Sequence, residues 1–160
     1  MEKLLTSVYK NRKISSLLTV SCHILSLIFV LDFCAVIGVE IYRAEYAIAI
    51  ETAVCAGVGF VAVTLLRRLI DAPRPYELYS FYEVKPKGRS GKSFPSRHAY
   101  SAFAISTLTF SVCIPIGIVL LILAALMCVC RVLLGIHFIR DVAAGALIGA
   151  VAGAIGLILI

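Results

Sequence analysis

The chain has 160 residues, of which 61% are hydrophobic and 15% charged, and its mean hydropathy is +1.03. Soluble domains are about half apolar and about one quarter charged, so this composition excludes a water-soluble globule, a disordered chain and a disulfide-stapled secreted module. The formal net charge is +6. In a soluble chain such an excess would indicate nucleic-acid binding, so its meaning depends on where the basic residues lie relative to the apolar segments.

In chain order, the sequence begins with a basic segment at residues 1–13, which we expect to lie on the membrane surface. Two apolar runs follow at about 17–41 and 47–66. Each is long enough for a membrane-spanning helix, which needs roughly 20 apolar residues. Asp32 and Glu51 lie inside these runs, and we expect structural roles for both.

Residues 67–97 form a polar, basic and proline-rich loop of 31 residues, and loops of this length are usually functional. The next 33 residues, 98–130, contain no Asp, Glu, Lys or Arg. One helix over this run would be about 50 Å long, whereas the hydrocarbon core is roughly 30 Å thick. Pro115 therefore predicts two short spans, 98–113 and 115–133, joined by a tight hairpin.

A last span is expected over about 141–160, where Gly145, Gly149 and Gly153 recur every four residues. Such a face suits close helix packing, which we expect within the bundle, with a homo-oligomer through the same face as a second hypothesis. The chain is therefore predicted to be a single membrane-embedded domain over residues 1–160. Its predicted fold is an all-α integral membrane helical bundle with about five transmembrane helices.

The six cysteines all lie within apolar stretches. They form no C-x-x-C pair, and no His/Cys cluster has the spacing of zinc ligands. We therefore expect small buried side chains with thiols, no disulfide framework and no metal site.

Three polar segments, 67–75, 94–98 and 131–141, lie at span ends, and five spans place all three on one side of the membrane. Their arginines offer planar forks of donors that match phosphate oxygens. Ser96 lies where a span should begin, and the free N–H groups at a helix start bind anions. Together these segments predict a phosphate site.

Two histidines accompany this site. His137 and Asp141 are four residues apart and share a helix face, so the carboxylate can hold one imidazole nitrogen and leave the other as a nucleophile or base. His98 is a second, separate imidazole, suited to protonating a leaving oxygen. These residue types predict phosphoryl transfer at a membrane surface.

The same residues resemble the three signature motifs of the type 2 phosphatidic acid phosphatase family, over roughly residues 60–150. The family pattern is Lys, six residues, Arg-Pro; then Pro-Ser-Gly-His; then Ser-Arg, five residues, His, three residues, Asp. The matching residues here are Arg67 with Arg74-Pro75, then Pro95-Ser96-Arg97-His98, then Cys130-Arg131 with His137 and Asp141. Order and internal spacing match throughout.

The resemblance implies a phosphatase without a metal or other cofactor. In it His137 attacks phosphorus to form a phosphohistidine, and Asp141 orients His137. His98 protonates the departing alkoxide and later activates water. The phosphate is implied to be held by Arg67, Arg74, Ser96 and Arg131.

The sequence departs from the family pattern at three positions. Arg67 replaces Lys and keeps the charge, and Cys130 replaces a Ser that would add one hydrogen bond. Arg97 replaces a Gly that lets the backbone approach phosphate closely. We expect Arg97 to bind phosphate instead, through a second phosphate or a headgroup.

The expected function is hydrolysis of a lipid phosphomonoester or diphosphate, with undecaprenyl diphosphate, phosphatidylglycerophosphate and phosphatidate as the main candidate substrates. The expected partners are this phosphorylated lipid and the bilayer, and no nucleic acid. The alternative hypothesis is a catalytically inactive lipid-phosphate binding or carrier protein. The two histidines and the aspartate argue against it, because binding alone needs only the arginines.

The small size suggests a minimal bacterial member of the family, so we expect an integral protein of the bacterial cell membrane. Fourteen of the fifteen Lys and Arg residues, all but Arg43, lie on the side of the N-terminus and the motifs. The positive-inside rule places that side in the cytoplasm, whereas family members more often present the site to the outer face. Both orientations stay open.

Overall fold

The computed structural model of the protein describes residues 2–79 and 91–159. Within these residues every regular element is a helix and no strand occurs, which confirms the predicted all-α fold. The elements are α1 (Glu2–Lys10), α2 (Arg12–Tyr42), α3 (Tyr46–Ile70), α4 (Pro75–Leu78), α5 (Arg97–Leu108), the 3-10 turn η1 (Thr109–Ser111), α6 (Ile114–Leu133) and α7 (Ile139–Leu159).

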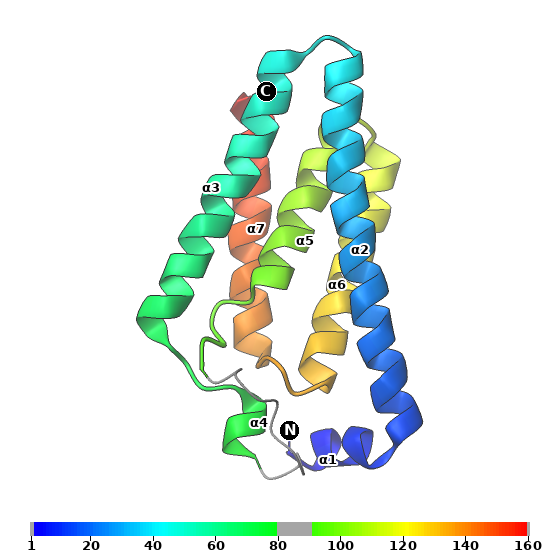
Figure 1. The fold of residues 1–160 in the computed structure, drawn as a ribbon, viewed down its shortest axis with the longest axis vertical. Coiled ribbons are helices and arrows are strands. Elements are labelled where there is room, and N and C mark those ends of the chain that lie inside the picture. The colour runs from blue at the N-terminus through cyan, green and yellow to red at the C-terminus, as the bar shows by residue number, and fades with distance from the viewer. Residues whose placement is uncertain (1, 80–90, 160) are drawn as a thin grey trace.

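Helices α2, α3, α5, α6 and α7 run along the long axis of one bundle (Figure 1). Among the described residues, four stretches are long and apolar enough to cross a membrane: Arg12–Tyr42, Tyr46–Leu78 (α3 with α4), Ile114–Leu133 and Ile139–Leu159. Helix α5 has 12 residues. It is therefore about 18 Å long, too short to cross alone. The expected five helices are present, with α5 shorter than predicted.

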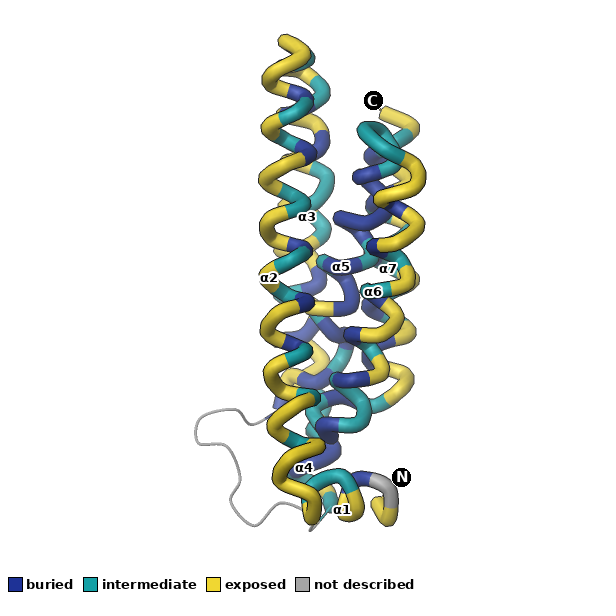
Figure 2. Tube along the Cα trace, turned by 90° about the vertical axis from the view of Figure 1, so that its right-hand side faces the viewer, coloured by how far each residue is buried: buried dark blue, intermediate teal, exposed yellow. Residues whose placement is uncertain are grey.

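Helix α5 forms the interior of the bundle. Eight of its 12 residues are buried, and Figure 2 shows it enclosed among the other helices. The outer faces of α2 and α3 instead expose large apolar side chains such as Leu31 and Val58. Extended apolar surface of this kind marks contact with a membrane.

The hairpin predicted at Pro115 is confirmed. The turn η1 ends at Ser111 and α6 begins at Ile114, with Pro115 in its first turn. Proline is tolerated there because the first N–H groups of a helix have no intrahelical acceptor. The hairpin brings the end of α6 back to the end of the bundle where α5 starts (Figure 1).

The glycine face of α7 packs against α5. A Cβ atom on Gly145 would meet the carbonyl oxygen of Ser96, and one on Gly149 would meet that of Tyr100. Gly153 is buried against the same helix. Close packing within the bundle is thus confirmed, and the contact leaves no surface at Gly145, Gly149 and Gly153 for the homo-oligomer of the second hypothesis.

Polar residues inside the bundle are mostly paired with hydroxyl groups. Asp32 accepts a hydrogen bond from Thr109 Oγ1 at 2.7 Å, in agreement with a structural role, whereas Glu51 is exposed on α3. Glu40, which we did not single out from the sequence, is 1% exposed and accepts a bond from Thr52 Oγ1 at 3.1 Å. Such bonds reduce the cost of placing carboxyl groups among apolar helices.

The segment 67–97, predicted as one active-site loop, is partly helical. It contains the last turn of α3, all of α4 and the first residue of α5, while residues 80–90 lie outside the described residues. Helix α3 ends at Ile70 because Asp71 takes the left-handed conformation, with φ 41°. Pro73 then disfavours a helical conformation at Ala72, and Pro75 takes the first position of α4, where a new helix begins.

Helix α1, formed by most of the basic segment 1–13, crosses one end of the bundle (Figure 1). Its Leu5 is fully buried against Tyr76 of α4. The hydroxyl of Tyr9 donates a hydrogen bond to the carbonyl of Leu134, at 2.8 Å. Helix α1 is therefore attached to the loops that follow α3 and α6, while its basic residues stay exposed.

We expect Gly145→Ala to lower the stability of the protein, because the new Cβ would collide with a backbone oxygen of Ser96. Overpacking of this kind costs about 1–3 kcal/mol. That exceeds the roughly 1 kcal/mol by which Ala favours a helix over Gly. The measurement is the midpoint of thermal unfolding in detergent.

Gly38→Ala is the matched control, since no atom lies within 4 Å of the Cβ position at this α2 glycine. This variant should unfold at the same temperature as the wild type or higher. An equal or higher midpoint for Gly145→Ala would contradict the close contact between α5 and α7.

Candidate active site

The three polar segments predicted from the sequence meet at one end of the bundle, beside α1 and α4 (Figure 1). Arg67 lies in the last turn of α3, and Arg131 lies in the last turn of α6. The charged groups interact across the elements. His98 interacts electrostatically with Arg131, His137, Arg97 and Arg67.

His137 and Asp141 form a buried pair, 3% and 0% exposed, with His137 Nδ1 3.6 Å from Asp141 Oδ2. The same carboxylate oxygen accepts hydrogen bonds from the backbone N–H of Phe138, at 2.9 Å, and from the hydroxyl of Ser93. Ser93 Oγ also lies 3.4 Å from His137 Nδ1. These contacts engage Nδ1, which leaves Nε2 as the ring nitrogen for chemistry.

The surroundings of His137 favour the neutral imidazole. Burial lowers its pKa from the ordinary value of 6.5, and the positive charges of Arg74 and Arg67 lower it further. The negative charge of Asp141 opposes this shift without reversing it. At pH 7 the ring therefore keeps a lone pair on one nitrogen.

Ser96 connects the start of α5 to the start of α7. Its side chain caps α5 by accepting a hydrogen bond from the backbone N–H of Ala99, at 3.5 Å. Its own N–H donates to the backbone carbonyl of Asp141, at 2.9 Å. The first turn of α5, with the positive end of the helix dipole, thus lies beside the His137–Asp141 pair and suits an oxyanion.

Two arginines are fixed by backbone carbonyls. Arg67, 6% exposed, donates from Nη1 to the carbonyl of Pro95 at 2.9 Å. Arg74 donates from Nε to the carbonyl of Gly91 at 3.0 Å. Each guanidinium has five N–H donors, so each of these bonds orients the group and leaves other donors for a ligand.

Glu77 and Gly91 hold the segment that carries Arg74. The carboxylate of Glu77 accepts hydrogen bonds from the backbone N–H of Arg74, at 3.1 Å, and of Gly91, at 2.7 Å. Gly91 has φ 63°, and a Cβ there would meet the carboxylate of Asp71, so glycine is favoured at this position. Sequence reasoning did not assign a role to Glu77 or Gly91, although a glycine in a loop indicates a tight turn.

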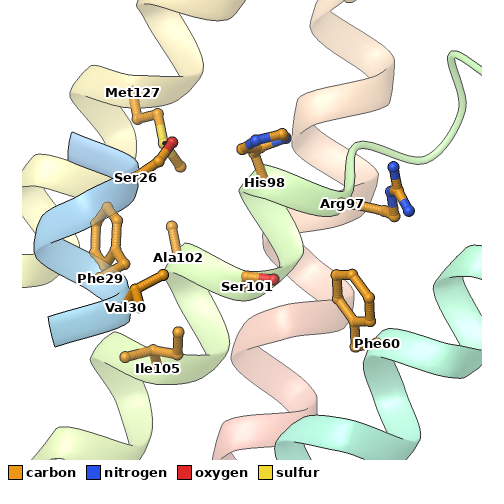
Figure 3. Close-up of a pocket in the computed structure, with 10 residues that line it drawn as sticks. All are labelled: Ser26, Phe29, Val30, Phe60, Arg97, His98, Ser101, Ala102, Ile105 and Met127. Atoms are coloured by element: carbon orange, nitrogen blue, oxygen red, sulfur yellow. Dashed lines mark hydrogen bonds between the residues drawn. The ribbon is translucent and has the colours of Figure 1, made fainter. Parts of the chain in front are cut away.

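An apolar cavity of about 330 Å³ opens beside His98, among α2, α3, α5 and α6 (Figure 3). Its lining residues are Ser26, Phe29, Val30, Phe60, Arg97, His98, Ser101, Ala102, Ile105 and Met127. His98 and Arg97 form its polar end, at the start of α5. The Arg97 guanidinium lies over the ring of Phe60, 5.7 Å from its centre.

Sequence reasoning also missed Ser93, which is fully buried beside the His137–Asp141 pair. It precedes the Pro95-Ser96 motif by only two residues, but its partner Asp141 is 48 residues away along the chain. No local spacing rule relates two residues so far apart.

Comparison with known proteins gives a family and several relatives. The sequence model of the PAP2 superfamily matches residues 46–160. The decaprenylphosphoryl-5-phosphoribose phosphatase of Mycobacterium tuberculosis, in two strains, is 39% identical over 105 residues, which are 62% of this chain and 56% of the relative. The chain thus spans little more than half the length of the curated relatives it matches.

Two solved structures share the fold. LpxE of Aquifex aeolicus has a TM-score of 0.72 and 26% identity, over 97% of this chain and 93% of that one. A PAP2-type phosphatidylglycerolphosphate phosphatase of Bacillus subtilis has a TM-score of 0.74 and 20% identity, over 99% and 83% of the two chains. The arrangement of helices described above is therefore one that both proteins share.

We expect His137 to take up its second proton below pH 6.5, because burial and nearby arginines lower its pKa from that value. The check is an NMR titration of isotopically labelled histidine in detergent micelles. The His137 signal is assigned as the one lost in His137→Asn. A titration midpoint above 6.5 would contradict the described surroundings of the ring.

Proposed function

Since the chain belongs to the PAP2 superfamily, we propose that it is a membrane-embedded phosphatase that removes phosphate from a lipid. The observation that carries this proposal is the meeting of the buried His137–Asp141 pair with fixed arginines, next to an apolar cavity. A nucleophile, an anion site and space for a hydrocarbon chain thus lie together. Hydrolysis of a lipid phosphate requires all three.

In the proposed reaction, Nε2 of His137 attacks phosphorus and forms a phosphohistidine, while the carboxylate of Asp141 lies on the Nδ1 side of the ring. Once the negatively charged phosphate is bound beside it, His98 acts in its protonated form and gives a proton to the departing alkoxide oxygen. Water then attacks phosphorus, His98 takes a proton from that water, and the N–P bond breaks. Inorganic phosphate leaves, and both histidines return to their starting states.

Positive charge for the phosphoryl group comes from Arg67, Arg74, Arg131 and the first turn of α5 after Ser96. Charge spreads over the phosphoryl oxygens in the transition state, so donors aimed there lower the barrier. Arg67 and Arg74 are already held by carbonyl groups and need little reorganisation when substrate binds. This scheme uses no metal ion and no other cofactor.

The cavity gives the lipid chain a place. The oxygen that His98 protonates is the one bonded to the lipid. The hydrocarbon tail of the bound lipid must therefore extend from the site on the side of His98. The cavity lies on that side. Val30 and Phe60 line it and are 57% and 40% exposed, so it reaches the outer face of the bundle, where membrane lipid lies.

The substrate class we propose is a phosphomonoester or diphosphate on a prenyl or acyl lipid. The Mycobacterium tuberculosis relative is named as a phosphatase of a phosphoribose linked to a decaprenyl phosphate. A sugar phosphate linked to a prenyl lipid therefore joins undecaprenyl diphosphate, phosphatidylglycerophosphate and phosphatidate as a candidate. Arg97, at the polar end of the cavity, would contact a second phosphate or a headgroup. The bacterial sources of the relatives support a bacterial cell membrane.

We expect the purified protein to release inorganic phosphate from at least one of these lipids in the presence of a chelator. His137→Gln should lower the rate by about 1,000-fold or more, because it removes the nucleophile. His98→Gln should lower it by about 100-fold or more, because it removes the acid. His23→Gln, at an exposed position on α2, is the control and should leave the rate unchanged.

Undiminished activity in His137→Gln would exclude the phosphohistidine mechanism. Binding of the lipids without release of phosphate by the wild type would favour the inactive binding or carrier protein.

We expect Val30→Trp to lower kcat/KM for long-chain lipid phosphates by about 10-fold or more, because the indole fills the cavity beside the chain. The rate with a short, water-soluble phosphate ester should stay the same. Leu31→Trp is the matched control: it is the next residue on α2 and is 59% exposed, against 57% for Val30, but it does not line the cavity. Equal losses in both variants would argue against the cavity as the lipid site.

A further inference from the structure

Ser93 is held in place independently of its side chain. It is fully buried in the segment between Gly91 and α5. Its backbone N–H donates a hydrogen bond to the carbonyl of Ala72, at 2.9 Å. This bond ties the residue to the connection between α3 and α4, so a substitution of the side chain leaves the backbone anchor intact.

The hydroxyl of Ser93 lies between the two partners of the catalytic pair. Its oxygen is 3.4 Å from His137 Nδ1, whereas Asp141 Oδ2 is 3.6 Å from the same nitrogen. Both distances exceed the usual 2.7–3.2 Å of an N–H···O hydrogen bond, so both contacts of Nδ1 are weak, and only the one to Ser93 is short enough to count as a hydrogen bond. The hydroxyl is the nearer acceptor for Nδ1.

The direction of the hydrogen bonds follows from the donors present. A serine hydroxyl has one proton and two lone pairs. Ser93 donates its proton to Asp141 Oδ2, so it has no proton left to donate to the imidazole. Nδ1 must therefore carry the proton shared with Ser93. The hydrogen bonds then form a series in which Nδ1–H donates to Ser93 Oγ and the Ser93 hydroxyl donates to the carboxylate. Nε2 is then the nitrogen with the lone pair.

We propose that Ser93 is a positioning residue that links His137 to Asp141, fixes the proton on Nδ1 and thereby keeps the Nε2 lone pair directed at phosphorus. This inference rests on the proposed function and deepens it. When Nε2 bonds to phosphorus, the ring becomes positively charged and retains its Nδ1 proton. The hydrogen bonds through Ser93 then connect this cation to the negative charge of Asp141, which stabilises it. The proton stays on Nδ1 throughout, and no further reactant is needed.

The kinetic test compares Ser93→Ala with Ser93→Thr, which restores the hydroxyl. Loss of a hydrogen bond that orients a reacting or ligating histidine typically costs about 10–100-fold, and we expect this loss in kcat of Ser93→Ala. KM should stay within about twofold, because the arginines still hold the phosphate. Ser93→Thr should regain most of the rate. Competitive inhibition by inorganic phosphate reports that the anion site is intact.

A double-mutant cycle separates this role from general support of the fold. In an Asp141→Asn background the series of hydrogen bonds from His137 through Ser93 to Asp141 is already interrupted. Adding Ser93→Ala should therefore change kcat by no more than about twofold. If the two substitutions acted independently on the fold, their separate reductions in kcat would instead multiply in the double variant. A full additional loss in the double variant, or an unchanged kcat in Ser93→Ala alone, would overturn the proposal.

A measurement without turnover distinguishes this inference from the proposed function. Nitrogen NMR of labelled His137 at neutral pH should show a protonated Nδ1 and a bare Nε2 in the wild type, and a changed tautomer ratio in Ser93→Ala. If this change occurs while the wild type releases no phosphate from any lipid, the proposed phosphatase activity fails and the role of Ser93 in fixing the tautomer stands. An unchanged tautomer ratio overturns that role even in an active enzyme.

Discussion

In α7 a glycine recurs every fourth residue, and the backbone of α5 lies directly against that face. This approach lets the N–H of Ser96 reach the backbone carbonyl of Asp141, at 2.9 Å, so that the first residues of two helices are joined. This bond fixes the distance between the start of α5, proposed to bind the phosphate, and Asp141 beside His137. Because the atom nearest to a Cβ at Gly145 is the backbone oxygen of Ser96, rotation of a side chain could not make room for a larger residue there.

The same end of the bundle gathers like charges. Arg67 interacts with both Arg97 and Arg74, and Asp141 offsets only part of their repulsion. Removing such groups from water and placing them together opposes folding. Binding of the proposed phosphate dianion would relieve this repulsion and would therefore be favoured by it. The charges of Arg74 and Arg67 also lower the pKa of His137, so the groups proposed to bind the phosphate would also keep the proposed nucleophile unprotonated.

Sequence reasoning was most successful where local rules apply. Apolar run lengths predicted the membrane helices, Pro115 predicted the hairpin, and motif spacing predicted residues such as His137 that the fold brings together. It did not show that α5 is the inner helix, because every span in a membrane is apolar and periodicity then carries little information. Ser93 and Glu77 were missed for a related reason. Asp141 lies 48 residues from Ser93 and Gly91 lies 14 residues from Glu77, and no local spacing rule relates either pair.

The cavity beside His98 has a consequence for the energy cost of each turnover. Because Val30 and Phe60 bring its lining to the outer face of the bundle, a lipid could enter sideways from the bilayer. Extraction of a lipid into water costs about 0.8 kcal/mol for each methylene group, more than 10 kcal/mol for a chain of about 15 carbons. With lateral entry, the chain exchanges one apolar environment for another and only the headgroup moves. Chain length then has little effect on the barrier to binding, so a bundle this small could act on very long lipids.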